Sequence, residues 1–381
     1  MMRGSGSRQP LTDRTLIIVL IGLLLTGLVM VTSSSLNRTA TLHHMSFYFT
    51  LRQSIYIIGG IIMVIIAIVI PQKYIEQWSV HALFIALGLL FLVLLIGKEV
   101  KGSIRWLPLG VINLQPSEVA KLFLVIYIAS YLKRRQDEVR KSWWGFIKPL
   151  IILLLATGLL LAEPDFGASV VLIVTIMGMI FLAGTGLRHY CVLLLVTLLG
   201  ITLIAVSEPY RIRRLTSYMN PWAYQFGSGY QLTQALIAFG RGGWTGVGLG
   251  DSIQKLFYLP EAHTDFIFSI VAEEFGLTGC IVILLMLNYI AFKALRIGQT
   301  AERRTAYFSA YLSYGIGLFL MSQACINIGV NTGLLPTKGL ALPFISYGGS
   351  NLLVSCFSTG LLLRIDYENR CYFFKQSAYR Q

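Results

Sequence analysis

The sequence predicts an all-α protein that crosses a membrane many times. Of its 381 residues, 55% are hydrophobic and only 13% are charged, whereas soluble domains carry about 25% charged residues. Apolar runs of about 20 residues, long enough to span a bilayer as helices, recur along the chain. All eleven prolines lie outside the middles of these runs, as uninterrupted helices require.

About ten spans are expected. They cover residues 15–35, 54–70, 78–96, 116–132, 149–163, 166–183, 189–207, 265–292, 306–330 and 345–363. The polar turn Glu163-Pro-Asp-Phe-Gly167 separates the fifth and sixth spans. This division leaves two tails, 1–14 and 364–381, around one transmembrane domain, 15–363. The longest loop, 208–264, lies between spans seven and eight.

The distribution of Lys and Arg predicts the orientation. If the N-terminus is cytoplasmic, the inner segments hold 19 of the 31 Lys and Arg residues and the outer loops hold 11, with Lys121 inside a span. Cytoplasmic segments are enriched in these residues. Both termini are therefore predicted to be cytoplasmic, with the 208–264 loop outside. The net charge of +14 reflects this topology and attraction to anionic lipid, so nucleic-acid binding is not expected.

The long outer loop contains two recognisable patterns. Residues 230–239 read as a short amphipathic helix. Residues 240–250 then include six glycines, but they lack the Gly-Lys-Ser/Thr ending of a nucleotide-binding loop. We expect these glycines to allow close backbone packing or close approach to the phosphate or sugar of a ligand.

Asp265 is the leading candidate for chemistry, because it stands where this loop re-enters the membrane. An ionisable residue beside hydrocarbon is costly and is therefore a functional candidate. His263 is either a packing residue beside this acid or a substrate contact. Glu273 either lines the same cavity or forms a structural pair.

Cations on the predicted outer side have two interpretations. Arg105, Arg211 and Arg213 either anchor the loops to lipid head groups or bind a pyrophosphate, since guanidinium pairs with phosphate through two hydrogen bonds. In the fourth span, Glu118 and Lys121 are spaced to form a pair on one helix face. That pair either stabilises the bundle or lines a polar cavity in which the lysine faces an anion.

Lys338 and Ser346 complete the set of candidates, just before the last span. The sequence shows no His and Cys cluster with metal-ligand spacing, and no serine with a partner histidine. One acid among scattered cations suits general-base catalysis on a hydroxyl, with Arg and Lys holding an anionic leaving group.

Several long motifs resemble the SEDS family of polytopic cell-wall polymerases, and the resemblance covers essentially the whole chain. The motifs are Asn220–Ala223, Phe226–Gly242, Lys255–Phe266, Asn331–Gly339 and Pro343–Ser350. The Pro-Glu-Ala-His and Pro-Thr-Lys-Gly forms within them are more similar to the cell-division branch of the family than to its elongation branch.

The resemblance implies a peptidoglycan glycosyltransferase that joins lipid II units at the division septum, on the outer face of the bacterial inner membrane. The family's catalytic aspartate falls on Asp265, and its other functional positions fall on Arg105, Glu118 and Lys121. The resemblance also implies a class B penicillin-binding transpeptidase and other divisome proteins as partners. The apolar run 281–287 in span eight, together with span nine, is a candidate surface for the partner's transmembrane helix.

Other functions remain possible at this level. The chain could be a lipid II flippase, a scaffold for other synthases or an elongation-type polymerase. No cofactor is required by the motifs, and a divalent cation such as magnesium or manganese is left open, with no residues assigned to it.

Overall fold

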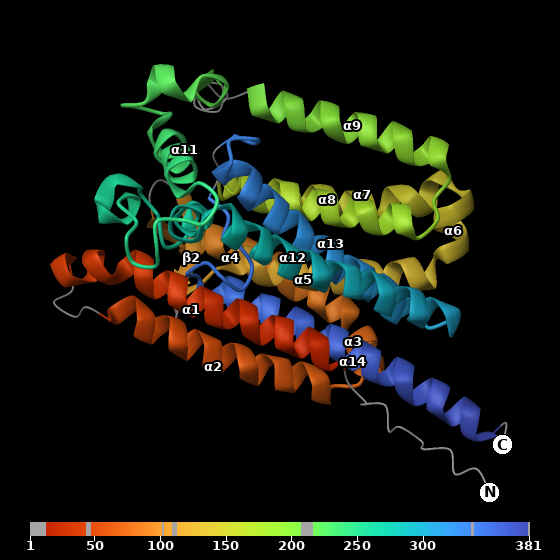
Figure 1. Cartoon of the computed structure of the whole chain (residues 1–381). Coiled ribbons are helices and arrows are strands. Elements are labelled where there is room, and N and C mark those ends of the chain that lie inside the picture. Colours follow the sequence, from red (N-terminus) through yellow and green to blue (C-terminus); the bar gives the residue numbers. More distant parts are fainter. Residues whose placement is uncertain are drawn as a thin grey trace, which may run out of the picture.

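The computed structural model describes residues 13–42, 47–100, 103–108, 113–206, 216–336 and 339–379. Within them, every predicted span coincides with a helix, and these helices run side by side as one bundle (Figure 1). They are α1 (Arg14–Leu42), α2 (Tyr48–Val69), α4 (Ser79–Ile96), α5 (Pro116–Arg134), α7 (Trp143–Ala162), α8 (Phe166–Leu182), α9 (Leu187–Val206), α12 (Ile267–Arg303), α13 (Tyr307–Asn331) and α14 (Gly349–Tyr379).

Five of the described helices are long and apolar enough to cross a membrane by themselves: α1, α2, α4, α12 and α13. Two shorter apolar helices cover Ile147–Ala162 and Phe166–Leu182. The protein is therefore a multi-helix membrane protein, while ten crossings remain a prediction. The polar turn predicted between spans five and six does separate α7 from α8.

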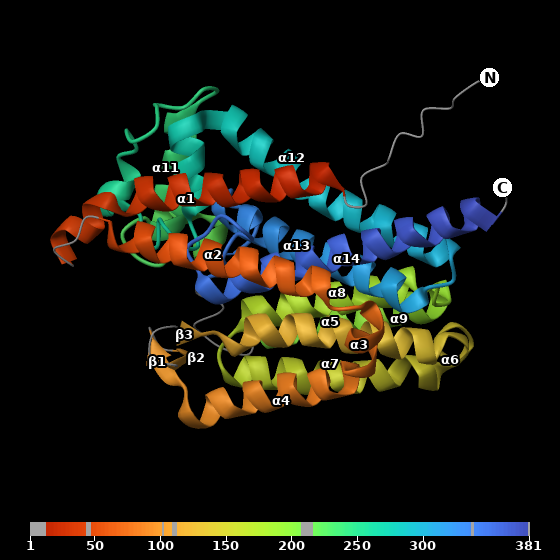
Figure 2. The ribbon, with the colours of Figure 1, turned by 90° about the horizontal axis from the view of Figure 1, so that it is seen from below.

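The two ends of the bundle differ (Figures 1 and 2). One end, here named the loop end, carries α11 (Tyr230–Gly242) and a small sheet. The other carries the short helices α3 (Gln72–Gln77) and α6 (Gln136–Lys141). The first described turn of α1 and the last of α14 lie at the α3 and α6 end. An even number of crossings predicts this arrangement.

The sheet is absent from the all-α prediction. Strands β1 (Lys98–Val100), β2 (Ser103–Pro108) and β3 (Asn113–Leu114) form an antiparallel sheet in the order β1-β2-β3. Strands of two to six residues are too short to show a clear alternation of apolar and polar positions. Two helices also run further than their predicted spans, α12 to Arg303 and α14 to Tyr379, because a helix need not end where its apolar run ends.

Helix α13 forms the centre of the bundle, with 72% of its apolar window buried. Glycines allow its neighbours to approach: a Cβ at Gly315 would lie 2.6 Å from Val125 of α5, and one at Gly317 would lie 2.8 Å from Ala294 of α12. Small residues at helix contacts are the usual means of close packing inside a membrane. This central position lets α13 contact the loop-end segments from several sides.

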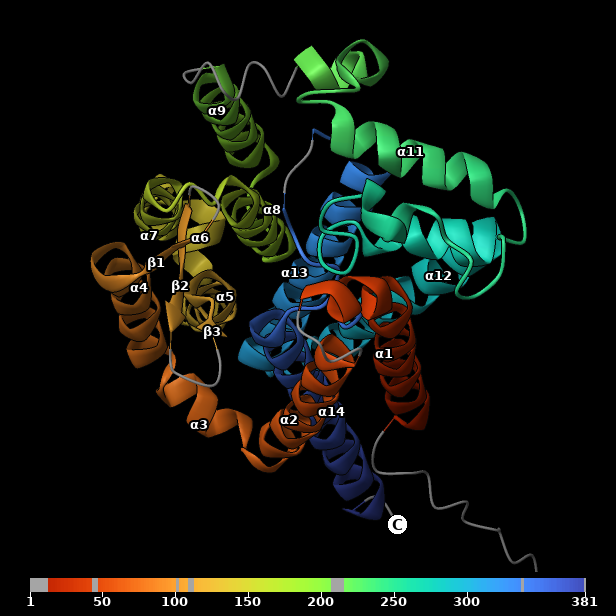
Figure 3. The same cartoon turned by 90° about the vertical axis from the view of Figure 1, so that its left-hand side faces the viewer.

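The predicted amphipathic helix in the long loop is confirmed as α11. Leu232, Ala235 and Ala238 form its buried face, and the helix lies beside α12 at the loop end (Figure 3). Two shorter turns, η1 (Pro221–Tyr224) and η2 (Gln254–Tyr258), flank it.

Candidate active site

Asp265 lies at the loop end, immediately before α12. Its backbone carbonyl accepts hydrogen bonds from Nδ2 of Asn327 and of Asn331 on α13, each at 2.9 Å. Its carboxylate lies against Gly339, since a Cβ built there would stand 2.6 Å from Oδ2. The position of the acid is thus set by α13 on one side and by the segment before α14 on the other.

A row of amides on α13 does this positioning. Gln323, Asn327 and Asn331 are four residues apart and therefore share one helix face. Nδ2 of Asn327 also donates to the Leu340 carbonyl at 2.5 Å, and Nε2 of Gln323 donates to the Ala341 carbonyl at 3.0 Å. This row was not predicted from the sequence, although three amides at helical spacing in an apolar segment were a usable signal.

The segment before α14 is joined to the Asp265 loop by further hydrogen bonds. Oγ of Ser346 donates to the Thr264 carbonyl at 2.7 Å and accepts from the Leu342 N–H at 2.8 Å. The Tyr347 N–H donates to the His263 carbonyl at 3.0 Å. Ser346 therefore binds two loop segments together.

His263 is packed among aromatic rings. Its side chain is only 6% exposed, and its ring centroid lies 4.8 Å from that of Phe49 and 5.8 Å from that of Tyr347. These contacts agree with the packing interpretation of this residue.

Glu118 and Lys121 form the predicted pair, with Nζ 2.9 Å from Oε1 and both side chains almost fully buried. Nζ also donates to Oε1 of Gln323 at 3.0 Å, and Oε2 of Glu118 accepts from Nδ2 of Asn351 at 3.2 Å. The pair is thereby connected to the amide row that leads to Asp265. Each buried charge is compensated by the other, so removing one of them is expected to be costly.

Arg105 projects from β2 to the turn between α7 and α8. Its Nε donates to the Glu163 carbonyl at 3.5 Å, its Nη2 donates to the Pro164 carbonyl, and its Nη1 lies 3.9 Å from Oδ1 of Asp165. Oδ2 of Asp165 accepts from Ser117, the residue before Glu118. The Arg105 side chain is 24% exposed, so a ligand at the loop end can still reach it.

Three candidates, Arg211, Arg213 and Lys338, lie outside the described residues, so their predicted roles stay predictions. In the part of the chain that is described, no three His, Cys, Asp or Glu side chains are grouped so as to hold a metal ion.

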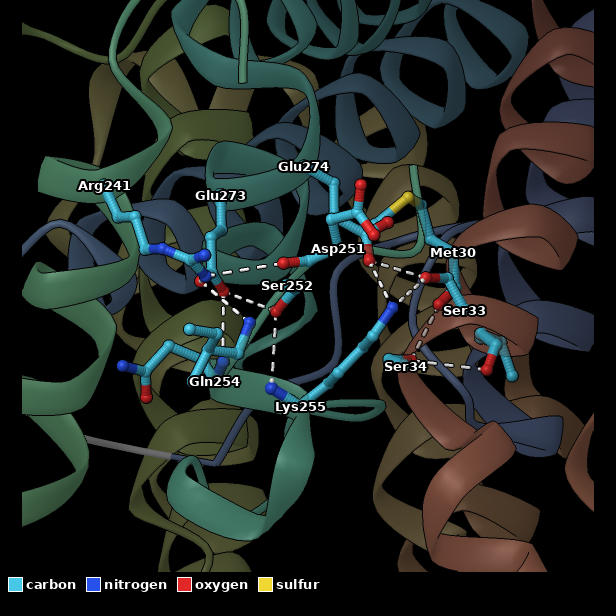
Figure 4. Close-up of polar contacts among 12 residues, drawn as sticks. Met30, Ser33, Ser34, Arg241, Asp251, Ser252, Gln254, Lys255, Glu273 and Glu274 are labelled. Atoms are coloured by element: carbon cyan, nitrogen blue, oxygen red, sulfur yellow. Dashed lines mark hydrogen bonds and ion pairs between the residues drawn. The ribbon is translucent and has the colours of Figure 1, made fainter. Parts of the chain in front are cut away.

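Glu273 takes part in a structural pair, one of the two roles considered for it. Its Oε1 pairs with Nη1 of Arg241 at 2.6 Å and accepts from the Ile253 N–H at 3.0 Å (Figure 4). The glycine-rich stretch 240–250 packs closely on α12, because a Cβ at Gly242 would stand 1.8 Å from the Ala272 carbonyl oxygen. Backbone packing, one of the two expectations for these glycines, is therefore confirmed.

The family model that covers FtsW, RodA and SpoVE, described as "Cell cycle protein", matches residues 13–371. The chain belongs to this family. The FtsW/RodA/SpoVE match confirms the resemblance inferred from the motifs, and it spans the whole described bundle apart from the end of α14.

Curated relatives within this family carry the name "Probable peptidoglycan glycosyltransferase FtsW". The one from Hahella chejuensis is 53% identical over 344 residues, covering 90% of this chain and 87% of the relative. The one from Legionella pneumophila is 49% identical over 372 residues, covering 97% and 94%. The one from Escherichia coli O157:H7 is 47% identical over 371 residues, covering 96% and 90%. The similarity to the cell-division branch is thus confirmed.

Solved structures share the fold. A chain of the structure described as "Structural coordination of polymerization and crosslinking by a peptidoglycan synthase complex" superposes with a TM-score of 0.78. It is 26% identical, and the match covers 94% of this chain and 98% of that one. The rod shape determining protein RodA of Thermus thermophilus superposes with a TM-score of 0.70 at 23% identity, covering 94% and 97%.

Proposed function

We propose that the protein is a peptidoglycan glycosyltransferase that polymerises lipid II during septal cell-wall synthesis. The observation that supports this most directly is the 53% identity over 344 residues to a relative named for that activity. The position of Asp265 fits the proposal, because a carboxylate with a fixed backbone at the loop end is suited to act on an extracytoplasmic substrate.

In the proposed reaction, Asp265 takes the proton from the GlcNAc 4-hydroxyl of an acceptor lipid II. The hydroxyl oxygen attacks the anomeric carbon of the MurNAc at the end of the growing chain. The bond from that carbon to the pyrophosphate breaks, and undecaprenyl pyrophosphate leaves. One direct displacement inverts the linkage from α to β, and no nucleotide is needed, because the pyrophosphate leaving group supplies the driving force.

The cations of the loop end would stabilise the charge that develops on the leaving pyrophosphate. Arg105 is accessible for this. Lys121 is only 1% exposed and lies 2.9 Å from Glu118, so its role requires the substrate to enter the polar cavity expected beside the pair. We extend this role to Arg211, Arg213 and Lys338. A magnesium or manganese ion would be held mainly by the pyrophosphate oxygens, as is usual for magnesium at phosphate substrates.

We also propose that the loop end faces the periplasm and that the partner is a class B penicillin-binding transpeptidase, with other divisome proteins. The partner's transmembrane helix would lie on α12 and not on α13, the other helix of the predicted surface, because 72% of the apolar window of α13 is buried. Ile281, Val282 and Leu285 of α12 are 44%, 54% and 64% exposed, so they face lipid or a partner.

The decisive test is polymerisation by the Asp265→Asn protein. The protein, its transpeptidase partner and lipid II are combined in detergent, and the glycan chains are measured. Loss of a general base is expected to lower the rate by about 10²–10⁴, while Asp137→Asn on α6, at the opposite end of the bundle, should leave it unchanged. A wild-type rate from a folded Asp265→Asn protein would remove Asp265 from the reaction. A flippase would make no glycan even as wild type, because it forms no glycosidic bond and detergent removes the barrier across which it would move lipid II.

A further inference from the structure

Helix α12 is interrupted by the loop that precedes it. The backbone of α12 departs from helical geometry at Gly276, where φ is 64° and ψ is −162°. In an unbroken helix, the N–H groups of residues 277 and 278 would donate to the carbonyls of Glu273 and Glu274. Here the glycine-rich stretch 240–250, the glycine loop, replaces both partners.

Four backbone hydrogen bonds join the glycine loop to the interrupted helix. They are Leu277 N–H to the Gly243 carbonyl at 2.9 Å, Thr278 N–H to the Trp244 carbonyl at 3.1 Å, Val247 N–H to the Glu273 carbonyl at 3.0 Å, and Gly248 N–H to the Glu274 carbonyl at 3.1 Å. Every backbone group freed by the break on these residues is therefore satisfied by the loop. An interrupted membrane helix requires such replacement.

Only glycine fits at the points where the loop enters. A Cβ at Gly246 would stand 2.1 Å from the Glu274 carbonyl oxygen, and Gly246 has a φ of +82°. Gly250 has a similar φ of +94°, but no atom lies within 4 Å of a Cβ built there. The two glycines therefore share a positive φ but differ in their contact with α12.

The side chains of Glu273 and Glu274 add further contacts between α12 and its neighbours, and they point to opposite sides (Figure 4). Glu273 faces the loop, where it pairs with Arg241 at 2.6 Å and accepts from Oγ of Ser252. Glu274 pairs with Nζ of Lys255 at 2.8 Å.

Ser33 of α1 shares the second pair. Its Oγ donates to Oε1 of Glu274 at 2.6 Å and accepts from Nζ of Lys255 at 3.0 Å. Glu273, Glu274 and Lys255 are all at least 92% buried, so these are desolvated contacts.

The break makes residues 265–275 a separate segment with Asp265 at its first position. Two bonds of the helical ladder that would tie this segment to the rest of α12, those from Leu277 and Thr278, go to the glycine loop instead. We propose that Glu273 and Glu274 are positioning residues, which fix the 265–275 segment to the loop and to α1 and so set the place of the Asp265 carboxylate. This inference rests on the proposed function, in which that carboxylate is the base.

The first experiment compares Glu274→Gln, Lys255→Gln and the double variant with Lys293→Gln. Lys293 is also on α12 and forms an ion pair, with Asp13 at 2.5 Å, but beyond the break. We expect Glu274→Gln to lower kcat about 10- to 100-fold, the effect of misplacing a reacting group by about 1 Å, with little change in lipid II affinity. The double variant, whose two amides can pair without charge, should recover much of this loss. Lys293→Gln should not lower kcat.

Hydrogen exchange supplies a readout that does not depend on activity. Amides of residues 266–275, 247 and 248 should exchange faster in Glu274→Gln, while those of α13 keep their protection. Gly246→Ala should reproduce the loss of kcat and the local exchange, and Gly250→Ala should not.

Two results would overturn the inference. One is a kcat of Glu274→Gln equal to that of Lys293→Gln, and the other is faster exchange throughout α13, which would show general destabilisation. The proposed function fails separately, if Asp265→Asn retains activity. The local exchange around the break would then still be measurable, so the two failures can be told apart.

Discussion

Replacement of Gly339 by alanine should displace the Asp265 carboxylate without unfolding the protein. The added Cβ would stand 2.6 Å from Oδ2 of Asp265, and ordinary contacts to a Cβ begin at 3.4 Å. The carboxylate oxygen must therefore retreat by the difference, 0.8 Å. Its backbone cannot follow easily, because its carbonyl is held by the amides of Asn327 and Asn331.

The expected loss follows from this displacement. Moving a reacting group by about 1 Å costs up to about 10² in rate, so Gly339→Ala should lower kcat about 10- to 100-fold, or about 1.4–2.7 kcal/mol in activation free energy. The KM for lipid II should change little, since the three atoms nearest to the added Cβ all belong to Asp265, the proposed base. Thermal stability should also stay close to that of the wild type, because a carboxylate end can move where a packed backbone could not.

Gly348→Ala is the matched control. It lies in the same segment, and a Cβ there meets nothing nearer than Asn351 at 3.8 Å. Both variants would be assayed for glycan polymerisation in detergent with the transpeptidase partner, and their melting temperatures would be compared. The reasoning is refuted if the two alanine variants polymerise lipid II equally fast, or if Gly339→Ala loses activity only in proportion to a loss of folded protein.

Three further outcomes are expected. Glu118→Gln or Lys121→Met alone should destabilise the protein by about 3–5 kcal/mol, the cost of an uncompensated buried charge. The double variant should regain stability but not lipid II affinity. If it regained affinity as well, the pair would have a purely structural role. Arg105→Lys keeps the charge but loses the planar guanidinium, so titration should show weaker lipid II binding, by about 1.5–3 kcal/mol at most, and unchanged affinity would contradict the pyrophosphate role. Leu285 is 64% exposed, so a cysteine there should crosslink to the transmembrane helix of the transpeptidase. Ile283 is 3% exposed, so a cysteine there should not crosslink. Equal crosslinking from both positions would refute the proposed surface.

The helices of this protein were readable from its sequence because each depends on local composition. A run of about 20 apolar residues needs no distant partner to be identified as a helix. The amphipathic residues 230–239 were identified as a helix for the same reason, and α11 begins at Tyr230 as predicted. The strand that carries Arg105 was missed because its pairing with β1 and β3 is not a property of its own six residues.

The candidate site was also predictable only in part. Asp265, Arg105, Glu118 and Lys121 were selected from residue type, position along the chain and the family motifs. Their partners were not, because hydrogen bonds such as those from Asn327 to Asp265 and from Lys121 to Gln323 join residues far apart in the chain. Glu273 shows most clearly what the sequence could not predict. Helical spacing alone left its two roles open, and the contact with Arg241 in the structure assigned it to a structural pair.

By itself, then, the sequence determined the class of the protein, the positions of its helices and the candidate residues for its chemistry, since these follow from hydrophobicity, charge and motifs within short stretches. Only the tertiary structure decided how those residues are held. The amide row of α13, the glycine at 339 beside the Asp265 carboxylate and the glycine loop inserted into α12 all depend on segments packing at distances of a few ångströms. Such contacts are set by the whole bundle at once, and no local pattern encodes them.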